Sequence, residues 1–246
     1  MMTETKKIAL VTGANKGIGF EIARQLGQQG IIVLLGARDQ GRREAAIQQL
    51  QTEGSEVVGV ALDVTSQTSI NAAAALIDTT YGRLDILVNN AAISLPAGRA
   101  IAGELDIDVL RATYETNVFG PFAVTKAMLP LLKRSEAGRI VNMSTQLGSL
   151  SMLSDPDSFV AKAPPVPAYN SSKTALNALT VAFASELHTT AIKINSVSPG
   201  FCATDLNGHR GFMTAAEGAK AVLPFALLPA DGPSGGFFGS GDTVPW

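Results

Sequence analysis

The sequence predicts a one-domain α/β protein, a Rossmann-type doubly wound parallel sheet of about seven strands with helices on both faces. Short continuous apolar runs such as Ile8–Val11 alternate with helix-period segments along the chain. This pattern is typical of strands buried on both faces and joined by helical crossovers. A glycine-rich turn follows the first run, and no internal repeat or linker interrupts the 246 residues. One domain over residues 1–246 accounts for that length.

The composition indicates a large core and argues against several classes of partner. Hydrophobic residues make up 46% of the chain, and the formal net charge is −2. No basic block occurs, so we expect no nucleic-acid or membrane partner. The apolar runs are too short to cross a bilayer, and no signal-peptide core precedes Ile8. With one cysteine and two histidines, we expect neither a disulfide framework nor a metal site, and a cytoplasmic protein fits these features.

The first strand, expected over Ile8–Val11, leads into a glycine loop and then a helical pattern. Strand, glycine loop and helix in this order are the context that a dinucleotide-binding loop requires. Gly13 would make the tight turn, Gly17 would let the backbone approach a phosphate, and Gly19 would let helix and strand pack closely. A plain βα turn would need one glycine rather than three. The cofactor pyrophosphate would then lie at the helix N-terminus, against the loop Thr12-Gly13-Ala14-Asn15-Lys16-Gly17-Ile18-Gly19.

The second strand, expected over Ile31–Leu35, ends at residues that bear on the choice of cofactor. An acidic residue there would bind the ribose 2′-hydroxyl of NADH, whereas arginine accommodates the 2′-phosphate of NADPH. Arg38 occupies this strand end and Lys16 lies in the glycine loop, so the two cations favour NADPH. Asp39 would serve as the ribose acid if the strand ended later. We favour Asp39 as the cap of the next helix, expected over Gln40–Gln51.

The next two strands end in further candidate cofactor contacts. A strand over Val57–Leu62 runs into Asp63 and Val64, and Asp63 would either bind an adenine amino group or cap a helix. A helix over Ile70–Tyr81 precedes a strand over Leu84–Val88, which ends at Asn89-Asn90-Ala91-Ala92. Small residues there would let the backbone lie against a flat ligand. The amide of Asn89 would alternatively cross-link neighbouring strands.

The middle of the chain supplies two polar residues at unusual places. A helical stretch begins at Leu105–Leu110, and a second helix runs from Glu115 to about Lys133. Asn117 is a poor helix former among apolar neighbours, in a turn that Gly120 and Pro121 also weaken. A strand over Arg139–Met143 ends at Ser144. A hydroxyl at the carboxyl end of a strand faces the crevice where open α/β sheets bind ligands.

Tyr169 and Lys173 lie four residues apart on a predicted helix and therefore project from one face. A free phenol titrates near ~10, and a neighbouring ammonium group favours the phenolate, which would make the phenol an acid or base at working pH. The preceding segment Thr145–Ala168 carries four prolines and no clean period. A loop of that length in a compact domain is usually functional. We therefore expect a substrate-loop insertion at about 145–168.

The last third of the chain completes the sheet. A strand over Ala191–Val197 is followed by Pro199-Gly200 and a polar, glycine-bearing segment, about 201–216, which we expect to be a flexible substrate loop. A helix over Glu217–Leu228 with a break at Pro224 precedes a short strand over Gly235–Gly239. Residues 242–246 would be a tail.

Taken together, these motifs resemble the classical short-chain dehydrogenase/reductase family over nearly the whole chain. The motifs occur in the family's order. The C-terminal residues of the sequence and the residues of its first two loops resemble the carbonyl reductase branch of the family, which favours NADPH. The resembling motifs are Thr12-Gly13-x-x-x-Gly17-x-Gly19, Asn89-Asn90-Ala91, Asn117, Ser144, Tyr169-x-x-x-Lys173 and Pro199-Gly200-x-x-x-Thr204. Ala92 departs from the glycine that the family often has, and adds a methyl group.

The resemblance implies an NADPH-dependent reductase that transfers hydride to a ketone or aldehyde, or reversibly oxidises an alcohol. Tyr169 would be the general acid or base, and Lys173 would lower the pKa of the phenol and hold the nicotinamide ribose. Ser144 would stabilise charge on the carbonyl oxygen. Asn117 would hold a water that relays protons to Lys173. Asn90 and Ile93 would lie along the cofactor ribose, and Thr204 would meet the carboxamide.

The substrate would be a small carbonyl or alcohol, and the apolar residues of the surrounding loops favour a hydrophobic one. The Ser144–Tyr169 gap is longer than the usual one in the family but shorter than the insertion of monomeric carbonyl reductases. A homodimer, a homotetramer and a monomer are therefore all open. Three rival interpretations are an NAD-dependent alcohol dehydrogenase of the same family, an epimerase or dehydratase of the extended type, and an inactive NADP(H)-sensing protein. Inactive members tend to lose tetrad residues, whereas all four are present here.

Overall fold

A central sheet organises the molecule, which we describe from a computed structural model covering residues 6–239 and 242–246. Within those residues the sheet has eight strands in the order β3-β2-β1-β4-β5-β6-β7-β8. The first seven are parallel, and β8 pairs antiparallel with β7. The strand order reverses between β1 and β4, which creates the crevice where such sheets bind ligands. The strands are β1 (Ile8–Thr12), β2 (Ile32–Ala37), β3 (Val57–Ala61), β4 (Ile86–Asn89), β5 (Arg139–Met143), β6 (Lys193–Ser198), β7 (Phe237–Gly239) and β8 (Asp242–Thr243).

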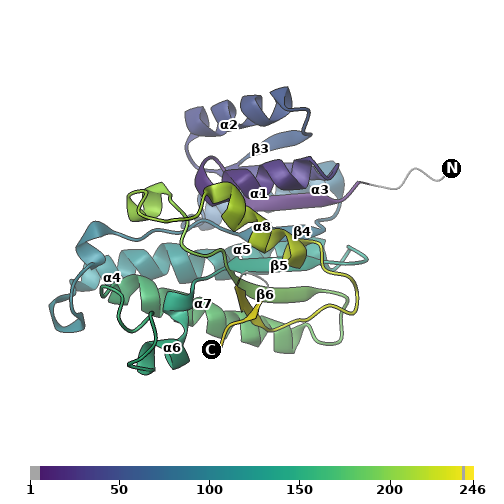
Figure 1. The fold of residues 1–246 in the computed structure, drawn as a ribbon. Helices are drawn as coiled ribbons and strands as arrows, with labels where there is room; N and C mark the ends of the chain where they lie inside the picture. The colour runs from purple at the N-terminus through teal and green to yellow at the C-terminus, as the bar shows by residue number, and fades with distance from the viewer. Residues whose placement is uncertain (1–5, 240–241) are drawn as a thin grey trace.

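Helices cover both faces of the sheet (Figure 1). One layer contains α1 (Gly17–Gly27), α2 (Gln40–Thr52) and α8 (Ala215–Ala226). The other contains α3 (Gln67–Tyr81), α5 (Gly120–Leu132) and α7 (Pro167–Glu186), with α4 (Ile107–Tyr114) packed on α7. The five-residue helix α6 (Leu150–Ser154) lies between β5 and α7 in the chain. Among the described residues, no helix has both the length and the apolar character needed to cross a membrane.

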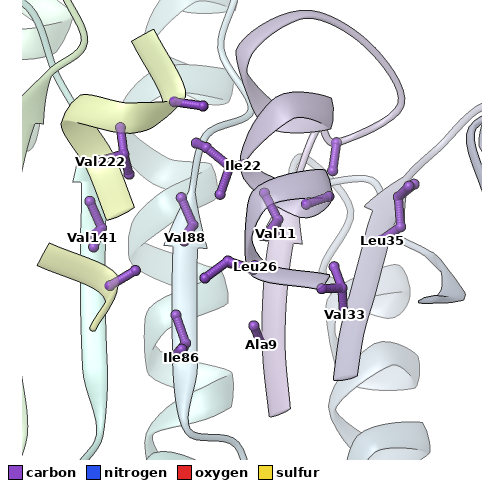
Figure 2. Packing of buried hydrophobic residues seen from close by; sticks show 14 of the residues in the cluster. Ala9, Val11, Ile22, Leu26, Val33, Leu35, Ile86, Val88, Val141 and Val222 are labelled. Atoms are coloured by element: carbon purple, nitrogen blue, oxygen red, sulfur yellow. The ribbon is translucent and has the colours of Figure 1, made fainter. Parts of the chain in front are cut away.

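The side chains of each central strand divide between two cores. In β1, Ala9 and Val11 face the core under α1 and α8, whereas Ile8 and Leu10 face the core under α3 and α5. Figure 2 shows the first of these cores, with Ile22 and Leu26 of α1 lying over the strands. Because successive strand residues point to opposite faces, both alternate sets must be apolar when helices cover the two faces. The continuous apolar runs in the sequence follow from this double burial.

The order of elements agrees with the sequence prediction, with two additions. The predicted tail contains the two-residue strand β8, and the predicted loop contains the short helix α6. Ser149 caps α6 by accepting a hydrogen bond from the backbone N–H of Met152. Neither element is long enough to show a hydrophobic period, so local patterns do not reveal them. The predicted break at Pro224 is also absent, because α8 continues to Ala226.

Trp246 holds the insertion against the sheet. The backbone N–H of Ser151 in α6 donates to the carbonyl oxygen of Trp246 at 2.8 Å, and the Ser151 hydroxyl donates to the same oxygen. The Trp246 ring stacks on Phe237 of β7, with ring centroids 5.6 Å apart. The 145–168 insertion is therefore fixed to the far edge of the sheet through the C-terminal residue.

Candidate active site

The loops that follow β1 and β4 are tied together at the strand-order reversal. The Thr12 hydroxyl oxygen accepts hydrogen bonds from the backbone N–H groups of Asn90 and Ala91, both at 3.0 Å. In return, the Asn90 amide donates to the Thr12 carbonyl at 2.8 Å. This reciprocal bonding places the glycine loop and the Asn90 segment side by side, where they form the floor of a cleft.

The glycine loop requires glycine for reasons that only partly match the prediction. Gly13 has a φ of +63°, and a Cβ there would lie 2.9 Å from the Cα of Ala91, which confirms the tight turn. A Cβ at Gly19 would lie 2.3 Å from the Asn90 amide nitrogen and 2.8 Å from the Gly13 carbonyl. Gly19 therefore makes room for Asn90 and the loop itself, whereas its predicted role is close packing of helix and strand.

The N-terminus of α1 opens into the cleft without a side-chain cap. Lys16 occupies the cap position, its side chain makes no capping bond, and no acidic residue lies in the first turn. The first N–H groups of a helix lack intrahelical partners and carry a partial positive charge. Their donor set suits a phosphate, and a pyrophosphate-bearing cofactor therefore fits this end of the cleft.

Cations gather where β2 ends. Arg38 and Arg42 both line the cleft, and Arg38 forms no ion pair within residues 6–239 and 242–246. Asp39 caps α2 by accepting from the backbone N–H of Arg42 at 2.8 Å, which confirms the predicted cap. Lys16 pairs across the cleft with Asp205. Two guanidinium groups and one ammonium group therefore border the end of the cleft where a 2′-phosphate would lie.

Asp63 lies in the wall of the same end. Burial alone would raise the pKa of Asp63, but two hydrogen bonds from Thr65 and the charge of Arg38 hold this pKa below its ordinary value. Its carboxylate accepts from the Thr65 backbone N–H at 3.0 Å, whereas Ser66 caps α3. The helix-cap interpretation of Asp63 is therefore wrong.

The cleft has a volume of about 540 Å³ and brings together nearly all of the predicted site residues. Two do not line it: Asn117 is fully buried behind it, and Gly200, with a φ of +86°, turns away against Met213. Those that do are Gly13, Asn15, Lys16, Gly17, Ile18, Gly19, Arg38, Asp63, Val64, Asn90, Ala91, Ser144, Tyr169, Lys173, Pro199 and Thr204.

Tyr169 and Lys173 face the cleft from the first turns of α7. The Lys173 ammonium lies 5.7 Å from the centroid of the Tyr169 ring and donates to the carbonyl oxygen of Met143 at 2.7 Å. Burial raises the pKa of Tyr169 to about 12 and lowers the pKa of Lys173 to about 7. The spacing of Tyr169 and Lys173 in the sequence predicts that Lys173 lowers the pKa of the phenol. In this structure desolvation raises that pKa instead, and the phenol is protonated at neutral pH.

Ser144 follows β5 and lies beside this pair. Its hydroxyl donates to the side-chain oxygen of Asn177, one turn beyond Lys173 on α7, at 2.7 Å. Both side chains are almost fully buried. The structure therefore places a hydroxyl, a phenol and an amine at the carboxyl end of β5, as the sequence predicted.

Asn117 supports the site from behind. It lies in a π-helical turn, Glu115–Phe119, which interrupts the helix where the sequence indicated a weak turn. Its side-chain oxygen accepts from the Ile93 N–H at 2.9 Å, and its amide group donates to the Ile93 carbonyl and to the Ser172 hydroxyl. Because both amide hydrogens are used, the side chain is committed to holding the Ile93 segment against α7.

Several residues that line the cleft were not predicted from the sequence. Arg42 is one, although a basic residue in the first helical turn after Arg38 was a usable signal. Asn177 is another contact of the site, and its spacing of four from Lys173 on the same helix face could have revealed it. The 201–216 segment was predicted to border the site through Thr204, but the contact of Asp205 with the cleft has no local signal, because Asp205 reaches it only through the tertiary fold.

The two predicted substrate segments border the cleft differently. The lining includes Ser144 and Tyr169 but no residue between them, so the insertion at 145–168 adjoins this cleft in the chain without lining it. The 201–216 segment folds back on itself through a bridge between Cys202 and Met213. The Ala203 N–H donates to the Met213 carbonyl at 2.8 Å. This fold brings Thr204 within reach of Gly17.

Known proteins resemble this chain over almost its whole length. Residues 7–213 match the sequence profile of the short chain dehydrogenases. The chain is 33% identical to (+)-neomenthol dehydrogenase of Capsicum annuum over 307 aligned positions, which cover 96% of each protein. It is 34% identical to carbonyl reductase (NADPH) 1 of Bos taurus, with all of both chains covered. The structure of NADPH-bound carbonyl reductase from chicken fatty liver has a TM-score of 0.87 at 28% identity, with 98% of this chain and 99% of that one covered.

Proposed function

The chain belongs to the short-chain dehydrogenase family and has reductases among its relatives, and from that premise we propose that it is an NADPH-dependent ketone or aldehyde reductase. The observation that carries this proposal is the shared cleft. Ser144, Tyr169 and Lys173 line the same cavity as the uncapped N-terminus of α1. Bound NADPH would supply the hydride.

In this proposal Tyr169 is the general acid. Its phenol is neutral at pH 7, and burial, which raises its pKa to about 12, keeps it so; it therefore holds the proton that a reduced carbonyl oxygen requires. The Ser144 hydroxyl would donate a hydrogen bond to the same oxygen and stabilise the charge that develops there. Lys173, with a pKa of about 7, would exchange protons near neutral pH and return one to the phenol.

We also propose a hydrophobic substrate. Large apolar side chains are exposed on the two segments that flank the catalytic end of the cleft. Phe212 is 85% exposed, Phe201 packs edge-on against it, and Leu150 and Phe159 are each about 60% exposed on the insertion. Aromatic and aliphatic surface of this kind favours apolar ligands.

The direct test is a panel of aliphatic, cyclic and aryl ketones and aldehydes with purified protein and NADPH. We expect consumption of NADPH at 340 nm with apolar ketones and a chiral alcohol as product. NADH and NADPH are compared with the preferred substrate. Binding of NADPH without consumption across the panel would favour the NADP(H)-sensing alternative.

The proposed cofactor preference predicts a selective effect of Arg38→Ala. The variant should raise the KM for NADPH about tenfold, because a charge-assisted hydrogen bond to the 2′-phosphate is lost at an exposed site. The KM for NADH should change little, since NADH has no such phosphate. Lys16→Ala should likewise raise the KM for NADPH much more than the KM for NADH.

Initial rates with each cofactor measure this effect. The matched control is Arg134→Ala, which removes an exposed arginine that pairs with Asp78 and does not line the cleft. Arg134→Ala should leave both KM values unchanged. An equal rise of the KM for NADPH and the KM for NADH in Arg38→Ala would contradict a contact between Arg38 and the 2′-phosphate.

A further inference from the structure

The Asn177 side chain is the hydrogen-bond acceptor of the Ser144 hydroxyl, and both side chains are buried. The Ser144 Oγ donates to the Asn177 Oδ1 at 2.7 Å, and the two side chains are 4% and 3% exposed. A hydrogen bond between buried groups holds both partners firmly, because breaking it leaves a polar atom without a partner. The position of the Ser144 hydroxyl therefore depends on Asn177.

The orientation of the Asn177 amide is fixed by a second contact. Its Nδ2 points to the carbonyl oxygen of Gly148 at 3.4 Å, and the Thr174 hydroxyl donates to the same oxygen at 3.0 Å. Gly148 packs tightly on α7, because a Cβ there would lie 2.9 Å from the Cβ of Lys173. A flipped amide would direct its oxygen at the Gly148 carbonyl, which is unfavourable, so Oδ1 faces Ser144.

A serine hydroxyl has one proton, and in this structure Asn177 accepts it. To donate to a substrate oxygen, Ser144 must turn that proton from Asn177 into the cleft. We propose that Asn177 is a positioning residue that holds the Ser144 oxygen in place and accepts its hydrogen bond until a carbonyl oxygen replaces Asn177 as acceptor. This inference rests on the proposed carbonyl reduction and deepens it, since Asn177 acts on the reaction through Ser144.

The decisive experiment is a double-mutant cycle of Asn177→Leu with Ser144→Ala. Leucine is close to asparagine in size and has no acceptor. We expect Asn177→Leu to lower kcat about tenfold, comparable to the loss of one neutral hydrogen bond, with the KM for NADPH unchanged. In the Ser144→Ala background the same change should lower kcat less than twofold. An equal loss of kcat in both backgrounds would overturn the proposal.

Thr174→Val provides the matched control. It removes the other hydrogen bond to the Gly148 carbonyl from the same helix but does not contact Ser144. Its effect on kcat should be the same in the wild-type and Ser144→Ala backgrounds. Asn177→Ala, which leaves space where leucine fills it, should show the same dependence on Ser144 as Asn177→Leu.

A second readout separates this inference from the proposed function. In cofactor-free protein, Asn177→Leu should lower the thermal unfolding midpoint more in the wild-type background than in the Ser144→Ala background. Equal shifts of the unfolding midpoint in the two backgrounds would show that the Ser144–Asn177 hydrogen bond does not stabilise the fold, and would overturn the inference. If the wild-type protein reduces no carbonyl with NADPH, the proposed function fails, whereas this unfolding cycle still decides whether Asn177 holds Ser144.

Discussion

Tyr169→Phe is expected to lower kcat about 100-fold or more, the scale of one general acid. The variant loses only the hydroxyl, so the ring, its contact with Lys173 and the packing of α7 remain. Without the phenolic hydroxyl, the carbonyl oxygen loses the group that would give it a proton directly. The loss should fall on kcat, because the change removes a group needed only as the oxygen gains charge.

Steady-state rates together with a cofactor titration measure this effect. The dissociation constant for NADPH, followed by the fluorescence of the bound cofactor, should stay within about twofold of the wild type. The control is Tyr81→Phe, which removes a half-buried phenol from the end of α3, outside the lining of the cleft. Turnover in Tyr169→Phe comparable to the wild type would refute the assignment of the acid.

Lys173→Met is expected to change how stability depends on pH. Folding lowers the pKa of Lys173 from 10.5 to about 7, so between these values the unfolded chain binds more protons than the folded one. Stability then rises with pH in that window, by at most about 1.4 kcal/mol per pH unit for one group. Methionine has no proton to lose. The wild type should therefore gain stability relative to Lys173→Met from pH 7 to pH 9.5.

Urea unfolding at intervals of half a pH unit measures this difference. The upper limit of pH 9.5 avoids Tyr169, whose raised pKa of about 12 makes stability fall only above about pH 10. Lys133→Met, at an exposed lysine after α5, should show no such difference from the wild type. Parallel stability curves for the wild type and Lys173→Met would show that Lys173 keeps its ordinary pKa in the fold.

Much of the fold could be predicted because its strands are buried on both sides. The strands β1, β2 and β4 read as short apolar runs, and glycine or polar residues follow each of them. Tyr169 and Lys173 could be predicted as a pair because the helix period places them on one face. These signals are all local in the chain.

The remainder depends on contacts between distant segments. The partner of Ser144 lies 33 residues away, and the partner of Lys16 lies 189 residues away. The pKa of Tyr169 was expected to fall because Lys173 is near in sequence, yet it rises because the fold removes water from the phenol. The sequence shows that a lysine lies near the tyrosine, which predicts stabilisation of the phenolate. It does not show how far the folded cleft removes water from the phenol.

The contact between Ser151 and Trp246 has a consequence for engineering this protein. The insertion is the segment that we would exchange with that of a relative, because it lies between β5 and α7 outside the sheet. A graft of residues 145–168 alone would separate α6 from the carbonyl oxygen that accepts its two hydrogen bonds. The exchangeable unit is therefore discontinuous: residues 145–168 and 242–246 should be transferred together, while the cofactor half of the sheet is left untouched.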